Sequence, residues 1–287
     1  MKFRSVPEGK KIPLNESTLL QGDALHALQI LPSNSVQCIV TSPPYWGMRD
    51  YNVANQIGLE STLPQFINRL LAVFDECRRV LKDNGVFWLN IGDGYTSGNR
   101  GWRAPDSKHP ARAMSTRPDT PEGLKPKDLL GLPWRLAFAL QDDGWYLRVD
   151  VIWNKPNAMP ESVKDRPPRS HEYLFMLTKN ERYFYDRESM LDQNGKNRRS
   201  VWDINTKPST GSHFATFPPK LITPCILSST NTDDFVLDPF FGTGTTGVVA
   251  VENGRKFVGI ELNPEYVKFS AERLMIASPL VLDRVAN

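Results

Sequence analysis

The sequence predicts an α/β fold in which a doubly wound, mostly parallel sheet carries helices on both faces. Short apolar runs alternate with segments of helical periodicity along most of the chain. These apolar runs show little alternation of polar and apolar residues, as expected for parallel strands buried on both faces. A glycine-rich turn, FGTGTTG at 241–247, joins one such run to the helix that follows it.

Composition sets the class of protein. The chain has 287 residues, of which 40% are hydrophobic and 23% charged, as is typical of one large globular domain or two smaller ones. A net charge of +3 permits a nucleic-acid partner without requiring one. Its three cysteines are far apart in the sequence, which indicates reduced thiols in a cytoplasmic protein and neither disulfides nor a zinc site. Neither a signal peptide nor a membrane span is expected.

The first half of the chain predicts alternating strands and helices. Residues 18–23 and 36–44 are expected to form strands, with a short helix between them at 24–32. The apolar periodicity of 66–85 predicts a long helix that an Asn-Gly pair closes. Residues 86–93 then predict a buried strand.

The second half continues this pattern after an insertion. Residues 94–127 have no apolar periodicity and carry seven basic against three acidic residues, a net charge of +4. An irregular segment of this length within a domain is usually functional or disordered. A second basic loop is expected at 154–171, and residues 179–212 are polar and irregular. The remaining predicted elements are a helix at 129–144, strands at 145–153 and 172–178, a helix at 217–230 and a strand–turn–helix–strand–helix unit at 235–274.

The glycine turn suggests a nucleotide-like ligand. Gly242, Gly244 and Gly247 form a G-x-G-x-x-G pattern between a strand and a helix. Glu261 ends the next strand and could accept both hydroxyls of a ribose. No lysine follows the glycines, which disfavours a P-loop, and Asp238 would repel a pyrophosphate, which disfavours a nicotinamide cofactor. A turn with no ligand is the simpler alternative.

S-adenosylmethionine satisfies these constraints, because it combines a ribose with a cationic end. Its α-ammonium would lie near Asp238, and its adenine beside Phe240 or Phe241. Asp23, at the end of another strand, could accept a hydrogen bond from the adenine amino group. Asp23 could equally act as the N-cap of the helix that follows it.

The stretch TSPPYW at 41–46 follows an apolar run and forms a rigid corner, because proline has a fixed φ and no N–H group. Together with DPFFGTGTT at 238–246, it resembles the DNA amino-methyltransferases, whose catalytic motif is [D/N/S]-P-P-[Y/F/W]. The catalytic motif precedes the cofactor motif here, as in the circularly permuted β-group. The resemblance covers about 16–275 and includes GDAL, HFATFP and GRKFVGIELNPEY.

This resemblance implies a single domain built on a seven-stranded, Rossmann-like methyltransferase sheet with loop insertions for DNA recognition. It divides the chain into a catalytic half at 16–178, a target-recognition segment at 179–212 and a cofactor-binding half at 213–275. The implied methyl donor is S-adenosylmethionine. The implied cofactor-binding residues are Asp23, Ala24, Thr216, Phe217, Asp238, Phe240, Phe241, Gly242, Gly244, Thr245, Thr246, Glu261 and Leu262.

The resemblance also assigns the catalytic corner to Ser42, Pro43, Pro44 and Tyr45. The Ser42 hydroxyl and the Pro43 carbonyl would accept hydrogen bonds from an exocyclic amino group, which favours its change toward tetrahedral geometry. The ring of Tyr45 would stack on the base, which must be flipped out of the duplex. Neither a metal nor a covalent intermediate is required. A strand-ending turn with core aromatics is the alternative.

Serine at the first motif position favours N4 of cytosine, and N6 of adenine stays open because both amino groups present the same two donors. Double-stranded DNA is the expected partner. The resemblance also allows a homodimer and a cognate restriction endonuclease. Methylation of RNA or of a small amine, and a non-catalytic DNA-binding role, are more remote alternatives.

Basic residues of the loops are the expected DNA contacts. We expect removal of Arg198 and Arg199 to weaken DNA binding without weakening cofactor binding. The full set is Arg103, Arg112, Arg117, Lys164, Arg166, Arg169, Arg198 and Arg199.

Overall fold

A computed structural model describes residues 1–6, 11–51, 53–97, 118–192, 194–206 and 217–277. Four predicted site residues lie outside these ranges: Arg103, Arg112, Arg117 and Thr216. None of the helices in the described ranges combines the length and apolar character that crossing a bilayer requires.

Within the described residues, a single sheet of nine strands forms the centre of the molecule, in the order β1-β2-β9-β8-β3-β4-β6-β5-β7. Of these nine described strands, only β6 runs antiparallel to its neighbours. The strands are β1 (Lys2–Ser5), β2 (Thr18–Gln21), β3 (Val36–Thr41), β4 (Leu81–Ile91), β5 (Tyr146–Asn154), β6 (His171–Thr178), β7 (Val201–Asp203), β8 (Phe235–Asp238) and β9 (Lys256–Glu261). The α/β fold and its mostly parallel sheet are therefore confirmed.

The expected number of strands was seven, and the two additional ones lie at the edges of the sheet. β1 pairs with β2 through its backbone, while its side chains are exposed, so its sequence lacks the apolar run of a buried strand. β7 has three residues and pairs with the end of β5. Its central residue, Trp202, is buried.

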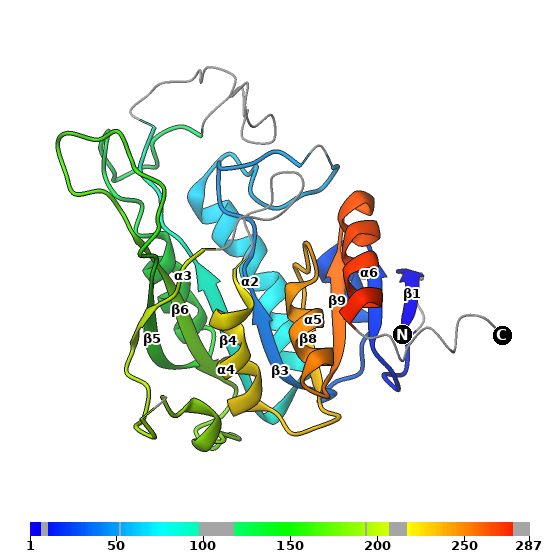
Figure 1. The fold of residues 1–287 in the computed structure, drawn as a ribbon. Helices are drawn as coiled ribbons and strands as arrows, with labels where there is room; N and C mark the ends of the chain where they lie inside the picture. The colour runs from blue at the N-terminus through cyan, green and yellow to red at the C-terminus, as the bar shows by residue number, and fades with distance from the viewer. Residues whose placement is uncertain (7–10, 52, 98–117, 193, 207–216, 278–287) are drawn as a thin grey trace.

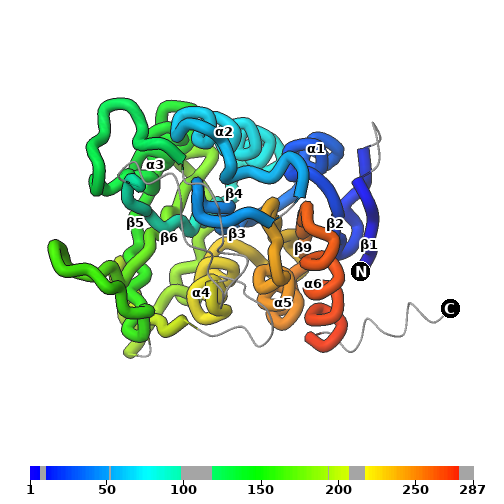
Figure 2. The backbone as a smooth tube through the Cα atoms, turned by 90° about the horizontal axis from the view of Figure 1, so that it is seen from above, coloured from blue at the N-terminus to red at the C-terminus, as the bar shows by residue number. Residues whose placement is uncertain are grey.

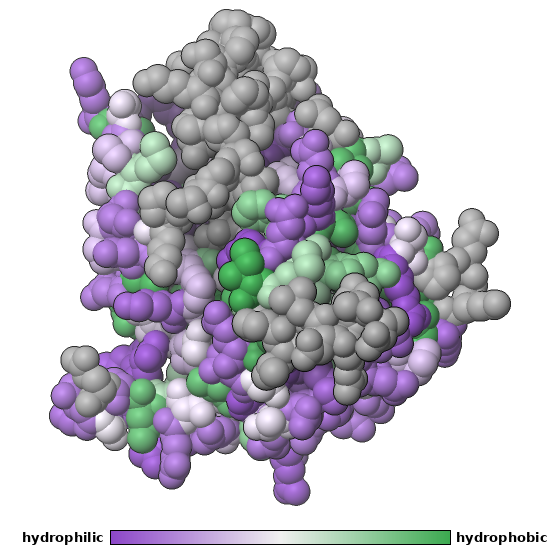
Figure 3. Space-filling view, turned by 45° about the vertical axis from the view of Figure 1, so that its right-hand side comes forward, coloured by the Kyte–Doolittle hydropathy of each residue, from purple (hydrophilic) through white to green (hydrophobic). Residues whose placement is uncertain are grey.

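Helices cover both faces of the sheet, as Figure 2 shows. One face carries α1 (Ala24–Gln29), α2 (Leu63–Val80) and α3 (Leu132–Asp142), and the other α4 (Pro219–Ser229), α5 (Thr245–Glu252) and α6 (Pro264–Ala277). A short 3-10 helix, η2 (Glu188–Met190), packs against α4. Each face has its own cluster of buried apolar residues. On the surface shown in Figure 3, polar residues predominate and apolar ones form small patches.

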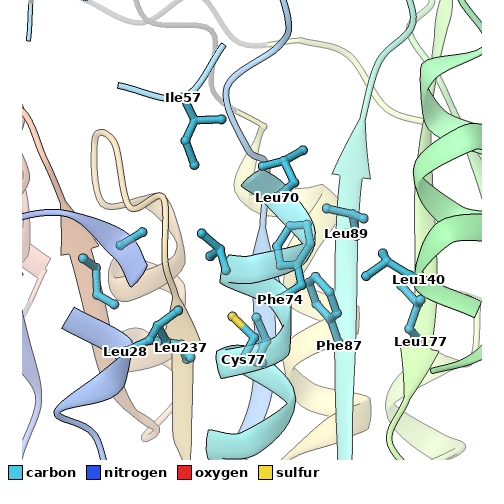
Figure 4. Packing of buried hydrophobic residues seen from close by; sticks show 14 of the residues in the cluster. Leu28, Ile57, Leu70, Phe74, Cys77, Phe87, Leu89, Leu140, Leu177 and Leu237 are labelled. Carbon is cyan, nitrogen blue, oxygen red and sulfur yellow. The ribbon is translucent and has the colours of Figure 1, made fainter. Parts of the chain in front are cut away.

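The long helix α2 is shifted toward the N-terminus relative to the prediction of 66–85. It begins after Thr62, whose side chain caps the backbone N–H of Gln65, and a proline occupies its first turn. It ends at Val80, because Leu81 is extended and already belongs to β4. Phe74 of α2 packs on Phe87 of β4 with ring centroids 5.1 Å apart (Figure 4).

The site follows from the topology. β3 and β8 are neighbours, but the helices that follow them, α2 and α5, lie on opposite faces of the sheet. Ligands of open α/β sheets bind at such a switch point, outside the carboxyl ends of the strands. At this edge lie 45–51, 53–60 and 155–170, in the loops at the top of Figure 1.

Candidate functional site

A cavity of about 1110 Å³ opens at the carboxyl edge of the sheet. The residues after β2, β3, β8 and β9, the end of β4 and the beginning of β6 all contribute to its wall. It brings together predicted residues that are far apart in the sequence. These are Asp23, Ala24, Ser42, Pro43, Pro44, Tyr45, Arg169, Phe217, Phe240, Gly242, Glu261 and Leu262.

The corner after β3 is anchored on both sides. Immediately before Ser42, the hydroxyl of Thr41 donates a hydrogen bond of 2.6 Å to the carboxylate of Asp238 on β8. After Tyr45, the indole of Trp46 is buried and donates to the carbonyl oxygen of Glu60 at 2.8 Å. Ser42 is therefore held at a fixed strand tip that faces the cavity.

The sequence predicts that the carboxylate of Asp238 faces the ligand. In the structure, it lies behind the cavity wall instead. Asp238 is 2% exposed and accepts hydrogen bonds from Thr41 (2.6 Å), Thr246 (2.6 Å) and the backbone N–H of Phe240 (3.1 Å). Burial raises the pKa of Asp238 to about 6, against the effect of these three donors. Asp238 thus joins the end of β3 to the glycine turn.

The glycine turn divides into a wall and a packing layer. Phe240 and Gly242 line the cavity, and Gly242 has a φ of +51°, which favours glycine. Phe241 points into the core, where its ring is 3% exposed and stacks on Phe257 at 5.4 Å. Of the two phenylalanines, only Phe240 can flank an adenine.

Three further predicted residues lie outside the cavity wall. Gly244 is the N-cap of α5, and Thr245 and Thr246 are buried in its first turn. A Cβ atom on Gly244 would come within 3.2 Å of the Phe241 ring, and one on Gly247 within 2.5 Å. Both glycines therefore make room for Phe241, and the structure gives them no surface in the cavity.

Glu261 ends β9 at the wall of the cavity. Its two carboxylate oxygens accept hydrogen bonds from the backbone N–H groups of Gly242 and Asn263, each at 2.8 Å. Burial outweighs these donors and raises the pKa of Glu261 to about 7. Asp23, on the neighbouring tip, caps α1 through the N–H of His26 at 3.0 Å and also lines the cavity.

Sequence reasoning missed a polar group opposite the glycine turn. Asn90 of β4, Lys155 after β5 and Glu172 of β6 line the cavity next to Tyr45. Asp93 also lines it, but its carboxylate accepts from the backbone N–H groups of Gly94, Gly131 and Leu132 at 2.8–3.1 Å. These residues could have been found in the sequence as polar residues at the ends of predicted strands that share one edge of the sheet.

The three basic residues of the loop at 155–170 that were predicted to contact DNA differ in their surroundings. Lys164 is exposed. The Arg166 guanidinium lies 3.9 Å from the centroid of the Tyr95 ring and pairs with Glu161 at 2.7 Å. Arg169 lines the cavity 3.8 Å from Asp93. Lys164 is thus the most accessible of the three.

Of the expected target-recognition segment at 179–212, the described residues 179–192 and 194–200 form no part of the cavity wall, whereas Thr206 lines it. Residues 193 and 207–212 lie outside the described ranges. The backbone N–H of Phe184 bonds to Asn84 near the start of β4, and that of Asp186 bonds to Ser228 at the end of α4. Residues 179–192 and 194–200 lie at the bottom of Figure 1, away from the carboxyl ends of the strands that border the cavity. Arg198 packs over the Trp202 ring at 5.0 Å, and Arg199 is exposed nearby. The placement argues against the recognition role expected for these two arginines.

Comparisons with known proteins agree with this geometry. A family model described as DNA methylase, of the N6/N4 methyltransferase type, matches residues 36–272. The chain is 67% identical to the type II methyltransferase M.Cfr9I of Citrobacter freundii over 96% of this chain and 93% of that protein. It is 56% identical to M.SmaI of Serratia marcescens over 95% and 96%.

Solved structures share the fold. The PvuII DNA methyltransferase, described as cytosine-N4-specific, superposes with a TM-score of 0.69 at 24% identity over 96% of both chains. A Thermus thermophilus protein solved with S-adenosyl-L-methionine superposes with a TM-score of 0.66 at 25% identity over 91% of this chain and 94% of that one. The chain therefore belongs to the N6/N4 family of DNA methylases.

Proposed function

We propose that this protein transfers a methyl group from S-adenosylmethionine to the exocyclic N4 of a cytosine flipped out of double-stranded DNA. S-adenosylmethionine is the methyl donor of the family. The observation that carries the proposal is a single cavity with Ser42-Pro43-Pro44-Tyr45 in one wall and Phe240, Gly242 and Glu261 in another. A base and a nucleoside cofactor can therefore meet there.

The residues of the cofactor wall fit the donor. Glu261 offers carboxylate lone pairs to the ribose hydroxyls in addition to those that hold Gly242 and Asn263. Asp23 uses Oδ1 to cap α1, which leaves Oδ2 to accept from an adenine amino group. Phe240 supplies a flat apolar surface. When bound, the cofactor supplies an activated methyl group on a sulfonium.

At the corner, the Ser42 hydroxyl and the Pro43 carbonyl accept hydrogen bonds from the amino group of the base. The lone pair of this amino group is delocalised into the ring of the base. Acceptors on its two N–H groups favour the tetrahedral geometry that methyl transfer requires. Tyr45 provides the stacking surface. Serine at position 42 supports cytosine N4 as the acceptor, and adenine N6 is the second candidate because the same two acceptors would bind its amino group.

The raised pKa of Glu261 predicts a pH-dependent affinity for the cofactor. Ribose hydroxyls donate to the ionised carboxylate, so binding favours loss of the Glu261 proton. We expect the affinity for S-adenosylmethionine to rise between pH 6 and 8, through the Glu261 pKa of about 7. Without ligand, the same shift lowers the free energy of unfolding as pH rises from 4.5 through about 7, because the folded state binds the proton more tightly.

Isothermal titration of the cofactor at several pH values measures this effect. Glu261→Gln is the matched control, because it removes the titrating group while the ionisation of the cofactor itself is unchanged. A pH profile with the same slope for both proteins would contradict the assignment.

We expect DNA to approach the cavity from the side of the loop at 155–170. Lys164 is exposed on the loop at 155–170, which borders the cavity. We expect Lys164→Ala to weaken binding of duplex DNA and to reduce the salt dependence by about one counterion. Arg199→Ala, on the opposite edge of the molecule, should leave both unchanged. Filter binding at increasing salt concentration measures the DNA affinity and its salt dependence. Equal effects of the two variants would contradict the proposal that DNA binds on the side of Lys164.

Transfer of a labelled methyl group tests the activity itself. Purified protein and labelled cofactor are incubated with unmethylated duplex DNA, with RNA of similar length and with free cytidine. We expect label only in DNA. Transfer to RNA alone would redirect the proposal to the alternative substrate class.

A further inference from the structure

The hydroxyl of Tyr45 belongs to a partly buried polar network. It donates a hydrogen bond to Oε2 of Glu172 at 3.0 Å, and the Asn90 amide donates to the same oxygen at 3.2 Å. The other oxygen of Glu172 pairs with the ammonium group of Lys155. The network thus joins the corner after β3 to β4, to the loop after β5 and to β6.

These charges are withdrawn from solvent. The side chains of Lys155 and Glu172 are 16% and 19% exposed. The Lys155 ammonium also lies 4.2 Å from the centroid of the Trp153 ring. An ion pair that is largely withdrawn from water loses hydration, and further hydrogen bonds compensate for that loss. Here Tyr45 and Asn90 provide that compensation, so the position of the carboxylate is closely defined.

The ring of Tyr45 is held at its edge as well as at its hydroxyl. A Cβ atom on Gly92 would come 3.0 Å from Cε2 of Tyr45 and 3.2 Å from Cγ of Glu172, so both side chains pack directly on the Gly92 backbone. Burial and the charge of Glu172 raise the pKa of the Tyr45 phenol well above its usual range, which keeps it a donor.

We propose that Glu172 is a positioning residue for methyl transfer: with Lys155 and Asn90, it fixes the ring of Tyr45 in the orientation that receives the flipped base. The inference rests on the proposed methyl transfer and is independent of whether the base is cytosine or adenine. A misplaced stacking surface lowers the rate of transfer while leaving the cofactor wall intact, because that wall is formed by other strand tips.

The test uses single-turnover methyl transfer to unmethylated, amplified bacterial genomic DNA. We expect Glu172→Ala to reduce the rate constant by about 10- to 100-fold, with an unchanged dissociation constant for S-adenosylmethionine. Glu172→Gln combined with Lys155→Met should recover most of the rate, because the amide oxygen still accepts from the Tyr45 phenol and no ammonium faces the amide NH2 group. In the Tyr45→Phe background, Glu172→Ala should have little further effect, because the hydroxyl through which Glu172 acts is absent.

Two controls separate positioning from instability. Glu76→Ala removes an ion pair on α2 with Arg79 and should leave the rate unchanged. Glu172→Ala leaves the ammonium group of Lys155 without its partner, and combining it with Lys155→Met removes that charge. The double variant should transfer methyl groups as slowly as Glu172→Ala and bind the cofactor with normal affinity.

Three results would overturn the inference: parallel losses of rate and cofactor affinity, Glu172→Gln as inactive as Glu172→Ala when both are combined with Lys155→Met, or full additivity with Tyr45→Phe. Absence of transfer by the wild-type protein would instead contradict the proposed function, so the two failures are distinguishable.

Discussion

Replacing Ser42 with alanine is expected to lower the rate of methyl transfer by about 100- to 1,000-fold, the cost of losing one preorganised hydrogen-bonding group at a reacting centre. The corner itself should persist, because Thr41 and Trp46 anchor it through Asp238 and the Glu60 carbonyl. Affinity for S-adenosylmethionine should therefore be unchanged. Single-turnover assays with labelled cofactor measure the rate, and equilibrium dialysis measures the affinity.

Ser61→Ala is the matched control, since Ser61 is exposed before α2 and lies outside the cavity wall. It should retain full activity. A Ser42→Ala protein that transfers methyl groups at the wild-type rate would remove the serine hydroxyl from the proposed mechanism and leave the Pro43 carbonyl as the acceptor.

Adding a single methyl group at Gly259 is expected to destabilise the protein by about 1–3 kcal/mol. A Cβ atom there would lie 2.5 Å from the Phe241 ring. The ring cannot move away, because Gly244 and Gly247 contact it from α5 and it stacks on Phe257. Thermal or urea unfolding of Gly259→Ala, monitored by circular dichroism, measures the loss.

The compensating variant separates crowding from other effects of the substitution. Phe241→Leu combined with Gly259→Ala provides space for the new methyl group and should be more stable than Gly259→Ala alone. If Gly259→Ala is as stable as the wild type, Phe241 does not occupy the position described, and its assignment to the core is wrong.

The seven central strands and the two motifs could be predicted from the sequence because each is a local pattern. Buried parallel strands give continuous apolar runs, and the SPPY corner and the glycine turn each fall directly after one of them. The edge strands β1 and β7 escaped prediction, because backbone pairing with one neighbour requires no apolar pattern in an edge strand.

Side-chain direction within the cofactor motif could not be predicted in the same way. Asp238, Phe240 and Phe241 lie within four residues, yet only Phe240 faces the cavity. Whether a residue at a strand-to-helix turn faces ligand or core depends on the packing of α5 against β9, a tertiary property. Asp238 is an example: its carboxylate is turned away from the cavity by hydroxyl groups on β3 and α5, two elements that meet only in the folded protein.

The network around Tyr45 was hidden for a related reason. Asn90, Lys155 and Glu172 come from separate parts of the chain, and no local motif joins them. They meet only because β4, β5 and β6 are neighbours in the sheet. The antiparallel direction of β6 brings its first residues, rather than its last, to the edge that holds the cavity.

Identification of the modified nucleoside tests the central claim most directly. Unmethylated duplex DNA is treated with the protein and S-adenosylmethionine, digested to nucleosides and analysed by mass spectrometry, with Ser42→Ala in parallel. We predict N4-methylcytosine with the wild-type protein and about 100-fold less with the variant. N6-methyladenine as the sole product would contradict the assignment to cytosine while retaining the catalytic corner, and no methylated nucleoside would contradict the proposed activity.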